Sequence, residues 1–226
     1  NQDVFVFNVL QALRYERVDT DTVLRMPADK AAALVKGVAD YRATVDANMA
    51  KVTAEPLADF PAWAETAKAI DDGYRAIQAL RVSADGNLAK APEARDAALL
   101  GSYMKDTAGI LTVFEAASKQ LDAEIRRRDA ASGELLLTKQ MAWNARSVSG
   151  TPAVLLQGAL AAGRQLAPAE APAIVAGRAQ AEITGASMKE MAKTQDLGPA
   201  FDAAVKTADE AYFTGAFNDA YLKALD

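Results

Sequence analysis

The chain has 226 residues and a formal net charge of −5, and 51% of its residues are hydrophobic while only 7% are aromatic. It contains neither histidine nor cysteine, which excludes imidazole bases, thiolate nucleophiles, Cys/His zinc sites and the Glu-x-x-His pairs of di-iron helical bundles. The acidic balance argues against a nucleic-acid-binding protein. We therefore expect no catalytic residues, no metal site and no cofactor.

The first part of the chain predicts four helices, because alanine is abundant and larger apolar residues recur at helical spacing. Pro56 and Pro61 predict a connection between the second and third helices. Asp85-Gly86-Asn87 predicts a loop over residues 82–91. The expected helices span residues 3–25, 27–51, 62–81 and 93–128.

The second part of the chain predicts three more helices. Ser132-Gly133 predicts a break after the fourth helix, and Gly150-Thr151-Pro152 predicts a kink in the fifth. The final helix is expected to continue without interruption to the end of the chain. The expected ranges are residues 135–163, 167–193 and 199–226.

These elements predict an all-α fold, an elongated up-down helical bundle made of two stacked four-helix-type modules that share long helices. We treat residues 1–226 as one helical domain whose composition allows a two-module division near residues 130–135. No segment approaches the roughly 20 apolar residues that span a bilayer. Because the chain begins with Asn1 and lacks a signal peptide, we expect it to be an excised fragment or a processed product, with flanking transmembrane helices outside it.

Polar residues interrupt the apolar face of the first predicted helix and include the main candidate ligand-binding residues. Arg14 and Arg17 are three residues apart, so they project from one side of a helix. A guanidinium presents a planar fork of donors that suits carboxylates, nitrate and similar anions. Tyr15 is adjacent and offers a further hydrogen-bond donor, although a buried tyrosine that binds a backbone carbonyl is an equal alternative.

A second segment echoes the first. Gln140 and Arg146 have the same six-residue spacing as a Gln and Arg17 in the first helix. We expect Arg146, with nearby Asn144, to reach the same volume as Arg14 and Arg17 from a second helix. The alternative is that acidic neighbours simply pair these arginines, and it leaves no pocket. The acids considered are Glu16, Asp19 and Asp21.

Two groups of segments carry a family resemblance. The first is Leu10-Gln-Ala-Leu-Arg-Tyr-Glu-Arg17 with Thr20-Asp21 and residues 41–46, and the second is residues 145–150 with 159–164 and 166–170. With these segments the chain resembles the nitrate- and nitrite-sensing all-helical domains found outside the membrane in bacterial histidine kinases and chemoreceptors. The family's adjacent arginine pair is replaced here by Glu16-Arg17, with Arg14 one turn earlier. The architecture is also similar to the helical bimodular domains of chemoreceptors, which bind small carboxylates.

The resemblance implies a periplasmic sensor domain of an inner-membrane signalling receptor and no enzyme activity in the domain itself. Its implied partners are a small anionic ligand, either nitrate- or nitrite-like or a small carboxylate, and a second copy in a homodimer. No nucleic acid partner is expected. The alternative is a helical protein–protein interaction module that holds no small ligand.

Overall fold

The computed structural model describes residues 2–54, 57, 60–161 and 163–225. Over these residues the secondary structure is helical and contains no strand, which confirms the predicted all-α helical bundle. Residues 55, 56, 58 and 59 of the predicted connection lie outside the described part. The chain divides into two compact units, Asn1–Gly133 and Glu134–Asp226.

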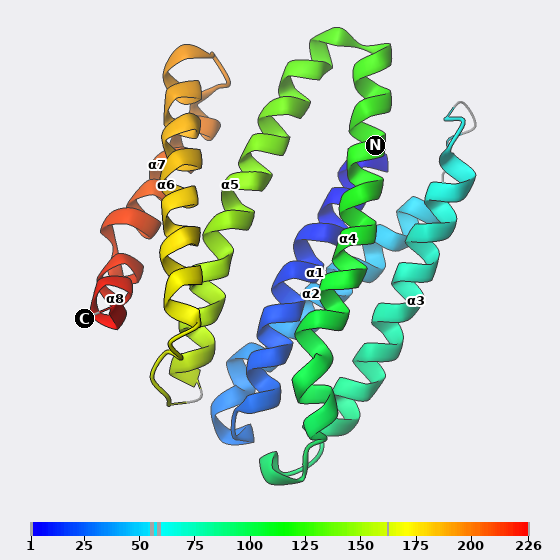
Figure 1. The fold of residues 1–226 in the computed structure, drawn as a ribbon. Helices are drawn as coiled ribbons and strands as arrows, with labels where there is room; N and C mark the ends of the chain where they lie inside the picture. Colours follow the sequence, from blue (N-terminus) through cyan, green and yellow to red (C-terminus); the bar gives the residue numbers. More distant parts are fainter. Residues whose placement is uncertain (1, 55–56, 58–59, 162, 226) are drawn as a thin grey trace. The chain divides into compact units, whose positions relative to one another are not determined.

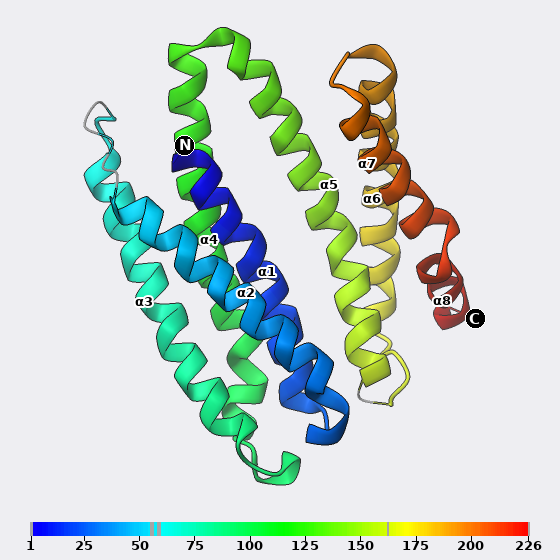
Figure 2. The same cartoon turned by 180° about the vertical axis from the view of Figure 1, so that it is seen from behind.

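The first unit is an up-down bundle of four long helices, in which consecutive helices run in opposite directions (Figure 1). Helix α1 packs against all three of the others and most extensively against α2 and α4. Figure 1 shows α4 in front of α1, and Figure 2 shows α2 on the opposite side. The elements are α1 (Gln2–Arg25), α2 (Ala28–Ala54), α3 (Trp63–Leu88), a short 3-10 turn (Pro92–Ala94) and α4 (Ala97–Arg128).

Buried polar residues interrupt the apolar core face of helix α1, and this interruption positions the candidate site. Val6, Val9, Leu10 and Leu13 are at most 2% exposed, so they anchor the first half of the helix in the core. Further along the same helix the fully buried Glu16 interrupts this apolar face, which resumes at the buried Leu24. The bundle therefore encloses charged groups that require partners.

The predicted loop over residues 82–91 is wrong for residues 82–88, because α3 continues to Leu88. Ala84 and Asn87 are buried, so this added helical segment contributes to the core, and tertiary packing outweighs the turn propensity of Asp85-Gly86-Asn87. The Asn87 side chain also holds the end of α3 against the start of α4. Its amide nitrogen donates to the Ser83 carbonyl (2.9 Å), and its oxygen accepts from the Asp96 N–H (2.7 Å). Asp96 in turn caps α4 by accepting from the Ala98 N–H.

The second unit is also helical. Its core includes Leu156, Ile174 and Tyr221, which come from three different helices. Gly177 allows close packing, because a Cβ at this position would lie 2.8 Å from the Pro152 ring. Its elements are α5 (Ala130–Ala161), which begins in the first unit, α6 (Glu170–Thr194), α7 (Pro199–Asp209), a π-helical turn (Glu210–Thr214) and α8 (Ala216–Leu225).

Two helix boundaries differ from the expected ones. The break after α4 falls at Asp129, which has an extended conformation, and α5 then passes through Ser132-Gly133 without interruption. The last predicted helix is interrupted by the π-helical turn and by extended backbone at Gly215. This interruption places Tyr212 and Phe213 against Arg178 of α6, so side-chain packing again outweighs local propensity.

Candidate functional site

The centre of the first unit is a buried ion pair between Glu16 of α1 and Arg81 of α3. Glu16 is 0% exposed, and both of its oxygens accept hydrogen bonds from the Arg81 guanidinium, from Nε at 2.7 Å and from Nη2 at 2.8 Å. This two-point geometry is the strongest form of ion pairing that side chains make. It joins α1 to α3 although these helices otherwise have few contacts.

The pair is extended by residues of α2 and α3. Arg81 Nη1 donates to Asp46 at 2.7 Å, and Arg42 Nε donates to Glu16 at 3.2 Å. Burial would lower the pKa of Arg81, but hydrogen bonds and charge attraction from Glu16 and Asp46 raise it above its ordinary value. Arg42 reaches Asp85 at 2.8 Å, so the network extends from the core to solvent. We call Glu16, Arg81, Arg42, Asp46 and Asp85 the buried charge network.

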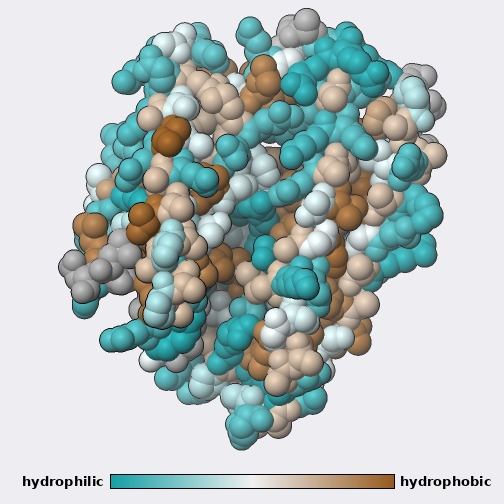
Figure 3. All heavy atoms as spheres, in the orientation of Figure 1, coloured by the Kyte–Doolittle hydropathy of each residue, from teal (hydrophilic) through white to brown (hydrophobic). Residues whose placement is uncertain are grey.

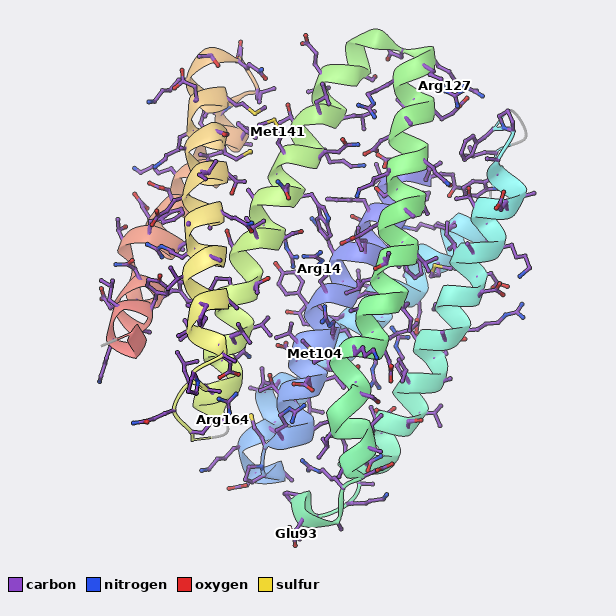
Figure 4. The ribbon with its side chains drawn as sticks, viewed as in Figure 1. Arg14, Glu93, Met104, Arg127, Met141 and Arg164 are labelled. Carbon is purple, nitrogen blue, oxygen red and sulfur yellow. The ribbon has the colours of Figure 1, made fainter. Side chains whose placement is uncertain are left out.

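Arg14 lies on another side of α1 and is ion-paired with α4. Its Nη2 donates to Glu115 Oε1 at 2.7 Å, and the two side chains are 22% and 25% exposed. Figure 4 shows Arg14 extending outward from α1. The alternative prediction of a simple ion pair therefore applies to this arginine, with a partner on another helix.

Arg17 differs from Arg14, because no described residue forms a hydrogen bond or an ion pair with it. Its Nε is buried and has no partner among the described residues. Burial lowers the pKa of Arg17, and the positive charge of Arg14 lowers it further, while Asp21 and Tyr103 act in the opposite direction. A half-buried cation beside a second cation is unfavourable by itself, and an anion would relieve that cost.

The acids that flank Arg17 in the sequence are engaged elsewhere. Glu16 belongs to the buried charge network, and Asp21 binds Arg25 at 2.8 Å. Asp19 faces α2, where its carboxylate lies 3.5 Å from the position that a Cβ of Gly37 would occupy. Burial raises the pKa of Asp19 above its ordinary value. None of these three acids therefore forms an ion pair with Arg17.

The buried Tyr103 hydroxyl lies within electrostatic reach of Arg17, and the buried Thr20 hydroxyl is a neighbour of Tyr103. Thr20 of α1 and Tyr103 of α4 are 0% exposed, and the two hydroxyls are neighbours, yet neither makes a hydrogen bond of good geometry to a described residue. Burial raises the pKa of Tyr103 to about 12, so the phenol stays protonated and can donate. Arg17, Thr20 and Tyr103 thus combine positive charge with hydrogen-bonding capacity that the fold leaves unused. We call these three residues the α1–α4 polar site.

The other predicted ligand-binding residues occupy different surroundings. Tyr15 is 48% exposed and stacks on Tyr41 of α2 with ring centroids 5.3 Å apart. Arg146 and Asn144 lie on α5 in the second unit, where Arg146 stacks over the Trp143 ring at 5.2 Å and Asn144 is exposed. The shared pocket of Arg14, Arg17 and Arg146 stays a prediction.

The buried charge network was not predicted from the sequence. Glu16 and Arg81 each continue a series of buried positions, Glu16 after Leu13 and Arg81 after Ile77. The positions of these two charged residues within apolar faces could have predicted the ion pair, because a charged residue buried with an apolar face needs an opposite charge as its partner. The expected loop after residue 81 concealed it by placing Arg81 at a helix end.

The chain matches no family model, no curated protein and no solved structure. Among the described residues, no cluster of three or more acidic side chains could hold a metal ion. None of the described helices is both long enough and apolar enough to cross a bilayer.

Proposed function

We propose that the chain is an extracytoplasmic sensor domain of a transmembrane signalling receptor and that it binds a small anion at Arg17 on α1. The observation that supports this most strongly is the half-buried guanidinium of Arg17, which has no acidic or hydrogen-bonding partner among the described residues. Folded proteins rarely leave such a group uncompensated. A ligand that brings a negative charge would supply the missing partner.

The chemistry of the α1–α4 polar site favours a compact, planar anion. The Arg17 fork binds two oxygens in one plane, as found in nitrate, nitrite and carboxylates. The Thr20 and Tyr103 hydroxyls would donate to oxygens on the inner side of such a ligand. Arg14 would add long-range attraction while it keeps its ion pair with Glu115.

Anion binding at this position would also connect two helices. Arg17 and Thr20 belong to α1, whereas Tyr103 belongs to α4, so a bound anion would bring the polar faces of the two helices together. Packed helices shift between discrete arrangements, and a small change at one level is carried along their length. This supports a sensor in which ligand binding moves α1 relative to α4. Flanking transmembrane helices, a periplasmic location and homodimerisation belong to the same proposal.

A second candidate function is a protein-interaction module. Val175 and Ile183 of α6 are 50% and 69% exposed, and their eight-residue spacing places them on the same face of the helix. Figure 3 shows apolar side chains on α6 as separate patches among hydrophilic ones. A contiguous apolar surface is the usual sign of a protein-binding face. The separated pattern makes this candidate the weaker one.

Thermal unfolding in the presence of anions tests the proposal. Nitrate, nitrite, formate and acetate are compared with chloride at equal ionic strength, because a ligand at 100 times its Kd stabilises the folded state by about 2.7 kcal/mol. We expect one of these anions to raise the Tm of the parent chain and to have no effect on Arg17→Gln. The matched control is Arg75→Gln, which removes an exposed arginine that binds Asp71. Equal Tm values in all five salts would contradict the proposal.

A further inference from the structure

The second unit is packed in one part and hollow in another. Leu156, Ile174 and Tyr221 form an apolar core at one level of its helices. At another level lies a cavity of about 480 Å³, whose lining residues come from α5, α6, α7 and the π-helical turn. The volume lies within the range of small-molecule sites, roughly 300–1,000 Å³. Four elements of one unit thus surround a space of the size that a small ligand needs.

Small residues at the lining positions of α5 and α6 leave this space open. They include Ala142, Ala145 and Ala181, where a packed helical bundle has larger apolar side chains. The apolar lining of α7 is therefore covered only in part, and Phe201 and Val205 are half-buried. An apolar molecule in the cavity would remove this surface from water, which favours its binding.

The π-helical turn builds one wall of the cavity, and specific contacts hold it in place. Such turns release backbone carbonyls from the helical pattern, and here Arg178 of α6 donates to the Tyr212 carbonyl at 2.9 Å. The same guanidinium lies 4.6 Å from the Phe213 ring centroid. Gly185 permits the close approach of this ring, since a Cβ there would lie 3.1 Å from it. A wall fixed in this way reduces the ordering that a ligand must impose when it binds.

The charged lining residues are already engaged by groups of the protein. Lys189 of α6 and Asp209 of α7 form an ion pair of 2.9 Å. The Arg146 guanidinium stacks over the Trp143 ring at 5.2 Å. The Ser149 hydroxyl, another polar group of the lining, donates to the carbonyl of its own helix one turn earlier, at 2.7 Å. A ligand that brought a charge into this lining would have to displace one of these contacts, whereas a neutral ligand leaves them intact.

We propose that this cavity binds a neutral apolar molecule with two or three rings, or one of equivalent size, which completes the core of the second unit. An apolar cavity of about 150 Å³ is enough to hold benzene, and this one is about three times as large. The alanine and aromatic walls would surround the ligand. This site goes beyond the small-anion site at Arg17, uses different residues and takes a ligand of the opposite character.

Fluorescence titration of the full chain with 6-propionyl-2-(dimethylamino)naphthalene tests the proposal. This neutral two-ring dye emits at shorter wavelength in apolar surroundings. We expect saturable binding with such a shift, and displacement of the dye by naphthalene. The matched competitor 2-naphthoate adds a carboxylate to the same rings. It should displace the dye at least about tenfold more weakly, because burial of a carboxylate without a partner is unfavourable.

Two substitutions fill the cavity from different helices, Ala145→Phe from α5 and Ala208→Phe from α7. Each should abolish saturable binding of the dye. The matched control is Ala179→Phe, which places the same side chain at an exposed position of α6 outside the lining and should leave binding unchanged. Arg17→Gln should also leave dye binding unchanged, although it removes small-anion binding, so the two sites are tested separately.

The far-ultraviolet circular dichroism spectrum shows whether each variant is folded, and Ala145→Leu, a smaller change that should weaken binding, is measured where a phenylalanine variant is not. Absence of saturable dye binding to the parent chain would overturn the proposal. Binding that persists in a folded cavity-filling variant, or displacement by 2-naphthoate that is as strong as displacement by naphthalene, would overturn it as well. Size-exclusion chromatography addresses the other occupant: a parent dimer that becomes monomeric in Ala208→Phe would show that a second copy fills the cavity instead.

Discussion

Glu16→Gln is the substitution that most directly perturbs the buried charge network. It replaces a fully buried carboxylate with an amide of nearly the same shape, so packing is kept while the charge is lost. Removing one partner of a buried ion pair costs about 3–5 kcal/mol, because the remaining charge stays buried without compensation. Here Arg81 retains Asp46 at 2.7 Å and Arg42 retains Asp85 at 2.8 Å. We therefore expect a loss near the lower limit, about 3 kcal/mol.

Urea unfolding followed by tryptophan fluorescence measures this loss of stability in the first structural unit. Trp63 is buried in the first unit and Trp143 lies in the second, so a Trp143→Phe background leaves only the reporter of the first unit. Because the urea midpoint multiplied by the slope gives the free energy of unfolding, Glu16→Gln should lower the midpoint without changing the slope. Asp40→Asn is the matched control. It removes the acid of an exposed ion pair with Lys36 and should have no measurable effect.

A double substitution tests the physical reason for the effect. If desolvated charge is the cause, Glu16→Met combined with Arg81→Met removes both charges and should be more stable than Glu16→Gln alone. The reasoning would be refuted if Glu16→Gln unfolds at the same urea concentration as the parent chain. It would also be refuted if the double variant is the least stable of the three.

Three further outcomes are expected. Hydrogen bonds from Arg164 and from the backbone N–H of Ala167 lower the pKa of Glu170 to about 2. The stabilising contribution of this carboxylate is therefore complete above its ordinary pKa of 4.5 and is lost as the pH falls towards 2. An NMR titration of the Glu170 carboxyl should show this low midpoint, and Arg164→Gln should raise the midpoint. Tyr103→Phe removes a buried hydroxyl without a hydrogen bond of good geometry and should leave urea stability unchanged or higher, whereas a clear loss would reveal an essential bond. Gly177→Ala forces a Cβ against Pro152 of α5 and should destabilise the second unit by about 1–3 kcal/mol in an unfolding assay that follows Trp143. Gly86→Ala adds a Cβ that meets nothing within 4 Å and should stabilise the first unit by about 0.4–1 kcal/mol.

The fold class was predictable because it depends on the spacing of apolar residues along single helices. Leu10 and Leu13 stand at helical spacing in the sequence, and both are buried in the structure. The end of α3 was not predictable from local signals, since Gly86-Asn87 has the composition of a turn. Only packing of Ala84 and the side-chain bonds of Asn87 keep this segment helical.

The candidate site was predictable only in part. Arg14 and Arg17 are recognisable from their spacing, yet nothing local indicates that Glu115, a residue 101 positions away, pairs with Arg14 and not with Arg17. That choice depends on how α1 and α4 pack. Tyr103 was missed for the same reason, because its hydroxyl reaches Thr20 from a different helix. Long-range pairing decides which arginine is left for a ligand.

The most direct test of anion sensing is isothermal titration of the full chain with nitrate, nitrite, formate and acetate in chloride-matched buffer. Arg17→Gln and the exposed-surface control Arg75→Gln are titrated in the same way. We predict that the parent chain and Arg75→Gln bind one of these anions with the same affinity and that Arg17→Gln loses at least about tenfold in affinity. Equal affinity in Arg17→Gln and the parent chain, or no binding of any of these anions by the parent chain, would contradict the proposed site.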